Sequence, residues 1–144
     1  MSPNIHFSNA DISYKLRDKR RLRAFISSLF QQEGYVVAEL IYVFCSDEFL
    51  LDMNTRFLKH DYFTDIITFN LGDPAGDIVG EVYISVDRIK ANAKDYDVSQ
   101  EEELRRVMFH GALHLCGYGD LTKRQKEVMR SKEDKYLELY ASEL

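Results

Sequence analysis

The spacing of apolar residues in the first part of the chain predicts helices that alternate with strands. A helix is expected over residues 12–33, where apolar positions recur at helical spacing before Gly34 acts as a stop. The unbroken apolar run at 40–45 predicts a strand that is buried on both faces. Ser46 or Asp47 can then cap a second helix, because both side chains accept hydrogen bonds from free backbone N–H groups.

The rest of the chain continues with strands and ends in helices. Ser99 with Glu102, and Thr122 with Gln125, form capping-box patterns that open two helices. The predicted elements are strands at 65–71 and 78–85, a short helix at 87–96, a helix from Ser99 to near Cys116, and a last helix from Thr122. We therefore expect one α+β domain over residues 1–144. Its economical architecture is a single small mixed sheet of about four strands, covered by about five helices.

The charge of the chain narrows the possible partners. A net charge of −5 argues against a protein that coats nucleic acid through its bulk charge. One local basic cluster remains, within residues 15–23. This cluster is either a solvated helix face or a nucleic-acid contact made by Arg20, Arg21 and Arg23.

Apolar composition and cysteine content bear on where the protein works. No segment approaches the ~20 apolar residues of a membrane span, and the N-terminus lacks the apolar run of a signal peptide. Cys45 and Cys116 lie in apolar runs without a second cysteine at metal-ligand spacing, so we expect both to be buried and reduced. These features favour a cytoplasmic protein without a membrane partner.

The segment 109–121, with the sequence FHGALHLCGYGDL, carries the clearest candidate chemistry. His110 and His114 share one helix face, because residues four apart are neighbours there. Gly117 can end the helix in a left-handed turn, which would bring Asp120 back towards the histidines. We expect a three-ligand metal site with an open position at the C-terminal end of a central helix, as in catalytic zinc centres. The alternative is a pair of core histidines bonded to backbone carbonyls.

The same pattern, H-x-x-x-H-x-x-G-x-x-D, has the spacing of the metzincin zinc peptidases. Those enzymes need a glutamate directly after the first histidine as general base. The residue at that position is Gly111. A peptidase of that type is therefore not expected, although the metal geometry can be shared.

Three linked segments extend the comparison along the chain. They are HGALHLCGYGD at 110–120, NTRFLKHDYFTDIITF at 54–69 and GEVYIS at 80–85. Together they resemble the motifs of the YbeY family, bacterial endoribonucleases of ribosomal RNA maturation. The last helix, with Met129 and Glu133, also fits that family.

The resemblance implies a metal centre of specified ligands. His110 and His114 align with the family's first two ligands, and Asp120 falls where a third histidine is usual, which marks a branch with aspartate as third ligand. Aspartate oxygen can bind zinc, so we expect one Zn²⁺ per chain. The harder, more anionic ligand set leaves another divalent ion, such as manganese, open.

The resemblance also shows departures around the second motif. Leu58 stands where the family usually has an arginine proposed to act on RNA, and His60 where it usually has a lysine. The neighbouring Arg56 and Lys59, or His60, could contact RNA in place of that arginine. His60 and Asp65 are candidates for the general base, with Asp65 alternatively a residue that caps or orients its loop.

The function implied by the resemblance is a metal-dependent hydrolase. It would be a zinc endoribonuclease specific for single-stranded RNA, acting on ribosomal RNA precursors, including the 3′ end of the small-subunit RNA, and in ribosome quality control. Its partners would be that RNA and the small ribosomal subunit, with no DNA. Two alternatives are a non-catalytic ribosome-assembly factor with a structural metal and a metallohydrolase of another substrate.

Overall fold

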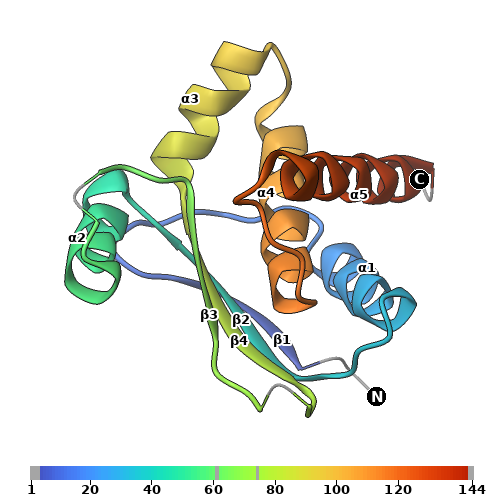
Figure 1. The fold of residues 1–144 in the computed structure, drawn as a ribbon. Helices are drawn as coiled ribbons and strands as arrows, with labels where there is room; N and C mark the ends of the chain where they lie inside the picture. Colours follow the sequence, from blue (N-terminus) through green and yellow to red (C-terminus); the bar gives the residue numbers. More distant parts are fainter. Residues whose placement is uncertain (1–3, 61, 74, 143–144) are drawn as a thin grey trace.

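The structure is a computed structural model that describes residues 4–60, 62–73 and 75–142. Four strands and five helices occur within these residues (Figure 1). In chain order they are β1 (Ile5–Asn9), α1 (Lys19–Gln32), β2 (Val37–Cys45), α2 (Asp47–Leu58), β3 (Ile66–Asn70), β4 (Ile78–Ser85), α3 (Val86–Tyr96), α4 (Gln100–Leu115) and α5 (Lys123–Ser142).

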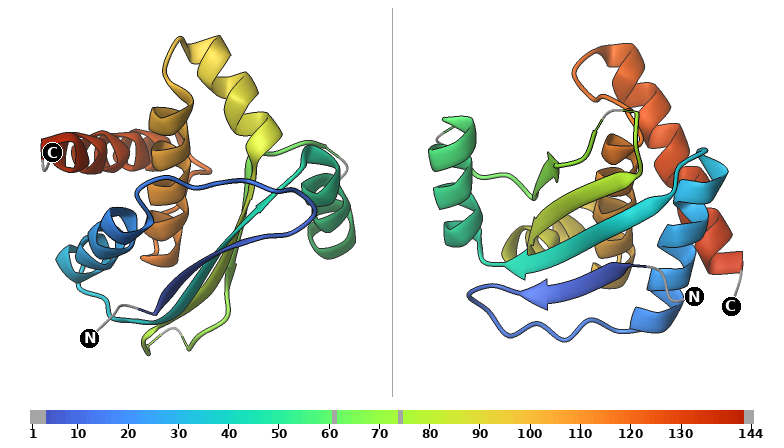
Figure 2. Two further views of the ribbon diagram at one scale, coloured as in Figure 1. Left: turned by 180° about the vertical axis from the view of Figure 1, so that it is seen from behind. Right: turned by 90° about the horizontal axis from the view of Figure 1, so that it is seen from below.

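The strands form one mixed sheet in the order β1-β2-β4-β3. β1, β2 and β4 run parallel, and β3 pairs antiparallel with β4 at one edge, so that Thr68 lies opposite Val82. The right-hand view of Figure 2 shows the four strands side by side, with β3 at one edge of the sheet. The expectation of an α+β fold with one small mixed sheet is confirmed.

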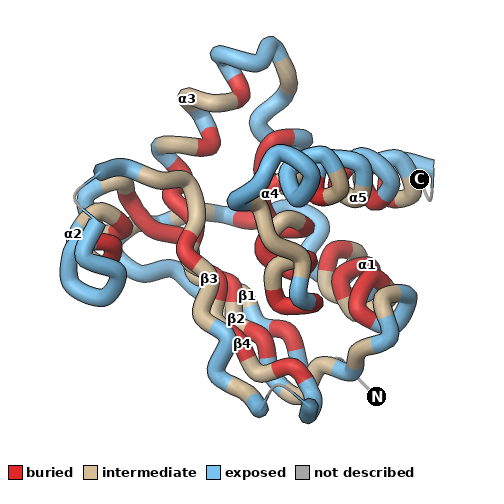
Figure 3. The backbone as a smooth tube through the Cα atoms, in the orientation of Figure 1, coloured by how far each residue is buried: buried red, intermediate tan, exposed pale blue. Residues whose placement is uncertain are grey.

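The two faces of the sheet are covered to different extents. α1, α4 and α5 lie on one side, where Tyr42, Val82 and Ile84 are buried in the main core (Figures 1 and 3). α2 packs on the other side, over a smaller cluster that includes Leu50 and Ile67. The prediction that the strand within residues 40–45 is buried on both faces is only partly right, because its side chains towards α2 are half-exposed at Ile41 and Val43.

Two predictions near the N-terminus are wrong. β1 was not expected, although it adds a parallel strand beside β2 through pairs such as Ile5 with Leu40. The first helix begins at Lys19 and not near residue 12. The chain before it crosses the core as an irregular segment that buries Leu16, and Asp18 adopts a left-handed conformation with φ 59°. That conformation interrupts any helix arriving from residue 12.

The predicted caps are confirmed. The Ser46 and Ser99 side chains accept hydrogen bonds from the first turns of α2 and α4. Thr122 and Gln125 form both halves of a capping box: the Gln125 N–H donates to Thr122 Oγ1, and Gln125 Oε1 accepts from the Thr122 N–H. These three helices, α2, α4 and α5, therefore begin directly after the capping residues that the sequence predicts.

α4 lies close against the sheet because a glycine faces it. An ideal Cβ on Gly111 would lie 2.9 Å from Val82 Cγ1 and 3.0 Å from Ile66 Cδ1. Real Cβ atoms essentially never come that close to a neighbouring atom. The absence of a side chain therefore fixes how near the histidine-bearing helix sits to β3 and β4.

Two further expectations concern the cysteines and the membrane. Cys45 and Cys116 are buried free thiols, and burial raises the pKa of each to about 12. Among the described residues, none of the helices has the length and apolar content needed to cross a membrane.

Candidate metal centre

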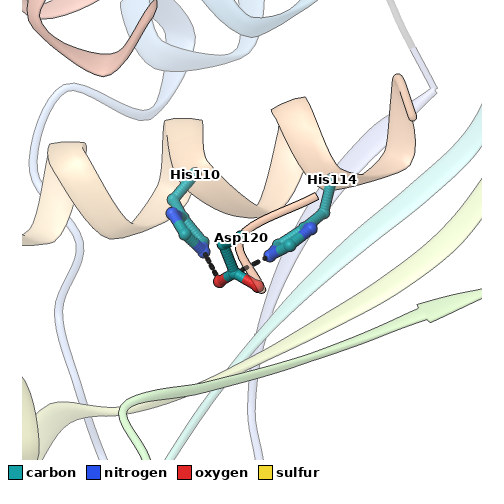
Figure 4. Close-up of side chains that lie close together, drawn as sticks. All are labelled: His110, His114 and Asp120. Atoms are coloured by element: carbon teal, nitrogen blue, oxygen red, sulfur yellow. Dashed lines mark hydrogen bonds and ion pairs between the residues drawn. The ribbon is translucent and has the colours of Figure 1, made fainter. Parts of the chain in front are cut away.

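Three predicted ligands converge at the end of α4. His110 and His114 project from neighbouring turns of this helix, and Asp120 approaches them from the following loop (Figure 4). Gly117 makes the reversal with φ +98°, as its position predicts. Asp120 Oδ2 lies 3.3 Å from His110 Nε2 and 3.2 Å from His114 Nε2. All three potential ligand atoms lie within 4.8 Å of one another.

The remaining nitrogen of each imidazole has its own acceptor. His110 Nδ1 lies 2.6 Å from Glu133 Oε2, and His114 Nδ1 lies 2.8 Å from the Tyr118 carbonyl oxygen. A proton on Nδ1 of each ring satisfies both acceptors and leaves each Nε2 lone pair directed at the Asp120 side. Two imidazole nitrogens and one carboxylate oxygen with fixed outer partners fit a divalent zinc-type ion.

Glu133 links His110 to a small ionic network between α4 and α5. Its other oxygen, Oε1, accepts from Arg106 at 2.9 Å, and Arg106 also binds Asp134 at 2.8 Å. Burial opposes protonation of His110, but the hydrogen bond and charge of Glu133, together with Asp120, outweigh it and raise the pKa of His110. The carboxylates therefore give the site a negative electrostatic potential, which favours binding of a cation.

The loop that carries Asp120 is held on both sides. Before it, the Tyr118 hydroxyl donates to Glu33 Oε1 at 2.6 Å, and Glu33 also accepts from Tyr136 and pairs with Lys132 at 3.2 Å. After it, the Leu121 N–H donates to the side chain that completes the α5 capping box, at 2.9 Å. These contacts fix Asp120 between α4 and α5 without any metal.

The three ligands open into a cleft of about 600 Å³ between β3, α3, α4 and α5. Two further acids, Asp65 and Glu103, line the same cleft. Burial raises the pKa of Asp65, and burial together with the charge of Asp65 raises the pKa of Glu103. The cleft thus offers space beside the predicted ligands, and its wall contains two acids whose pKa values are raised.

Comparisons with known proteins agree with this geometry. The family model described as Endoribonuclease YbeY matches residues 4–141. The chain belongs to the endoribonuclease YbeY family. This confirms the family, the hydrolase class and the endoribonuclease type that the sequence motifs suggest, and it favours them over a non-catalytic assembly factor or a hydrolase of another substrate.

Relatives within the family match over nearly the whole chain. A protein from Cytophaga hutchinsonii named Endoribonuclease YbeY is 47% identical over 135 residues, which are 94% of each chain. One of the same name from Flavobacterium psychrophilum is 42% identical over 92% of this chain and 94% of its own. A solution structure from Thermotoga maritima is 25% identical, with a TM-score of 0.68 over 96% of this chain and 90% of that one.

The structure separates the two candidates for a general base. Asp65 lines the cleft, where its side chain accepts a 3.4 Å hydrogen bond from Asn92, and its backbone carbonyl accepts from Ser85 at 3.0 Å. His60 is exposed outside the cleft wall and stacks on Tyr62 at 5.1 Å between ring centroids. Asp65 thus lines the cleft and contacts the elements beside it, whereas His60 lies outside the cleft lining and contacts Tyr62 of its own loop.

Leu58 and the two cations near it in the sequence lie in different places relative to the cleft. Leu58 lines the cleft as an apolar residue, at 42% exposure. Arg56 and Lys59 are exposed and lie outside the cleft lining, and Arg56 pairs with Asp52 at 3.1 Å on the surface of α2. Neither neighbouring cation stands in the place that Leu58 occupies.

The three arginines of α1 lie away from the cleft lining and have different environments. Arg20 is exposed. Arg21 donates to the carbonyl of Tyr140 and lies over its ring, and Arg23 donates to the Ile5 carbonyl at 2.8 Å. Two of the three candidates thus hold the ends of the chain against α1, and their role in RNA binding stays a prediction.

The residues that sequence reasoning did not assign are the outer partners of the site. Glu133, Glu103 and Arg106 come from two helices and meet only in the folded protein. One signal was present, because Glu133 is a charged residue on the buried side of α5, one helical turn after Met129. A buried acid at core spacing usually has a specific partner.

Proposed function

We propose that this YbeY-family endoribonuclease is a single-domain, zinc-dependent enzyme that cleaves single-stranded RNA in the cytoplasm. Its substrates are ribosomal RNA precursors, including the 3′ end of the small-subunit RNA, and it works with the small ribosomal subunit in maturation and quality control. The observation that carries the proposal is the convergence of His110, His114 and Asp120 beside the cleft.

The ligand set assigns distinct tasks to the residues of this chain. A divalent ion held there supplies Lewis acidity towards the scissile phosphate and its attacking water. Glu133 and the Tyr118 carbonyl orient the two imidazoles, so that both Nε2 atoms face the same point. Asp65, in the wall of the same cleft, is the group we assign to accept a proton, since burial has moved its pKa upwards, towards neutrality.

Metal analysis and cleavage of a single-stranded oligoribonucleotide test this assignment together. Wild-type protein prepared without a histidine tag and free of contaminating nuclease should hold about one zinc per chain, as expected for one three-ligand site. It should lose cleavage after chelation and regain it with zinc. His114→Ala and Asp120→Ala should lose both metal and cleavage.

Matched controls separate the site from general effects of substitution. His6→Ala and Asp95→Ala remove an exposed histidine and an exposed acid from β1 and α3, and both should keep metal and activity. Equal metal content in His114→Ala and wild type would refute the ligand assignment. Full metal content without any RNA cleavage would refute the enzyme and leave a structural metal.

Asp65→Asn tests the proton acceptor separately. The amide has nearly the same shape and keeps the contact to Asn92, but it cannot take a proton. We expect zinc content to stay unchanged and the cleavage rate to fall by about 10²-fold or more, the usual contribution of a general base. An unchanged rate would leave Asp65 with its loop-orienting role alone.

A further inference from the structure

The wall of the cleft contains more acidic side chains than arginines or lysines. Asp65, Glu103, Asp120 and Glu133 all line it, and each is a carboxylate when ionised. A phosphodiester carries a negative charge and would be repelled by this wall. Binding of RNA beside the metal ligands therefore needs cations at the same opening.

Two arginines line the cleft, and they differ in availability. Arg106 is held by Glu133 at 2.9 Å and by Asp134 at 2.8 Å, and its side chain is 18% exposed. Arg130 is 66% exposed, and its one ion pair among the described residues is a 4.0 Å contact with Asp134. The Arg106 guanidinium is held by two carboxylates of the protein, whereas the Arg130 guanidinium can turn towards a bound phosphate.

Arg130 also connects the cleft with a second depression along α5. This depression is lined by α5 residues that include Lys123, Lys126 and Arg130. The spacing i, i+3, i+7 places the three cations on one side of the helix, over a length of about 10 Å. Lys123 and Lys126 are exposed, and within the described part of the chain neither has an ion pair.

We propose that Lys123, Lys126 and Arg130, here termed the α5 stripe, bind successive phosphates of single-stranded RNA and lead its backbone into the cleft. Arg130 contacts the phosphate nearest the metal ligands, because it alone belongs to both depressions among the three. This inference rests on the proposed function and assigns the substrate-binding surface of the same site. Flexible cations on an open helix face suit a single strand, whose backbone can follow them.

RNA binding as a function of salt tests the stripe without depending on cleavage. A fluorescein-labelled single-stranded oligoribonucleotide is titrated with metal-free protein between about 50 and 200 mM KCl, the range in which counterion release is readily measured. Lys123→Gln/Lys126→Gln should weaken binding and flatten the log–log salt slope by about 1.4, since each single-strand phosphate contact contributes about 0.7. Arg130→Gln should flatten it by about 0.7.

The control is a pair of cations on another side of the same helix. Arg124→Gln/Lys135→Gln removes the same net charge from α5 and leaves the stripe intact. This variant should keep the wild-type salt slope. Arg130→Gln should also lower kcat/KM for cleavage by about tenfold or more, as expected for a charged hydrogen bond of roughly 1.5 kcal/mol, with zinc content unchanged.

The outcomes distinguish this inference from the proposed function. If wild type neither binds nor cleaves RNA, the proposed function fails and the stripe with it. If wild type does both, but the stripe variants match the Arg124/Lys135 control in slope and in kcat/KM, only the stripe is refuted. A stripe that binds an acidic protein instead would give that second result.

Discussion

Glu133→Gln perturbs the metal centre through a residue that touches no metal. The carboxylate serves two donors at once, His110 Nδ1 at 2.6 Å and Arg106 at 2.9 Å. An amide has a single oxygen, so glutamine can accept from only one of them. If that oxygen faces Arg106, the NH₂ group donates to His110 Nδ1 and forces the ring proton onto Nε2, the nitrogen that should bind metal.

The opposite orientation of the amide is also unfavourable. Its NH₂ group would then face the Arg106 guanidinium, which has no acceptor. Loss of such an outer partner typically lowers metal affinity by about 10–100-fold, which corresponds to about 1.4–2.7 kcal/mol. The hydrogen bond is short and the Glu133 side chain is only 8% exposed, so we expect the upper part of that range.

Competition with a chelator of known affinity measures this change directly. Asp134→Asn is the matched control, because it removes the other carboxylate of Arg106 at 2.8 Å, and no described contact joins Asp134 to His110. Urea unfolding without metal corrects for any general loss of stability. Zinc affinity of Glu133→Gln within about twofold of the control, far below the 10-fold minimum expected, would refute the role of Glu133 in orienting His110.

Three further predictions address other parts of the molecule. Asp120→His should still bind zinc but lose it more steeply as pH falls through about 6.5, because three imidazoles and not two must then be deprotonated; a metal-occupancy curve against pH checks this. Gly111→Ala should destabilise the protein by up to about 2 kcal/mol in urea unfolding, since overpacking against Val82 costs about 1–3 kcal/mol and the gain in helix propensity returns about 1. Arg23→Gln should cost about 1 kcal/mol through its lost bond to a backbone carbonyl, whereas Arg20→Gln should change stability by less than about 0.5, as the same unfolding assay would show.

The convergence of His110, His114 and Asp120 could be predicted from the sequence because their geometry is local. The helical repeat places His110 beside His114, and Gly117 reverses the chain within a few residues, so that Asp120 returns. No distant contact is needed to foresee this arrangement. The outer partner Glu133 is different, because its place beside His110 depends on how α5 packs across α4.

The errors near the N-terminus have a similar origin. β1 is short, and it is stabilised by pairing with β2, more than thirty residues away along the chain. The sequence before Lys19 does not have a helical pattern. Ile12, Tyr14 and Leu16 alternate with polar residues, which is a period of two and not the period of a helix. In the structure these three side chains pack on the core from an irregular segment.

Packing against the sheet explains why a glycine follows the first histidine. A metzincin glutamate at that position would enter the space between α4 and the sheet, where even the Cβ of Gly111 would collide with Val82. The helix therefore presents its two imidazoles towards the cleft and its glycine towards the strands. We propose that the proton acceptor comes from another element, namely Asp65 before β3, which lines the cleft.

The three predicted ligands are close together in the sequence, whereas the residues that line the cleft are far apart. The three predicted ligands lie within residues 110–120. Bringing them together closes only a short loop of chain, which costs little conformational entropy even in a partly folded molecule. The cleft, in contrast, needs β3 and α3 brought against α4 from distant parts of the chain. If these residues bind zinc as proposed, the ion can bind before the substrate surface has formed, and a preparation fully loaded with metal can still contain molecules unable to bind RNA. Counting active sites in this protein requires titration with the nucleic acid itself.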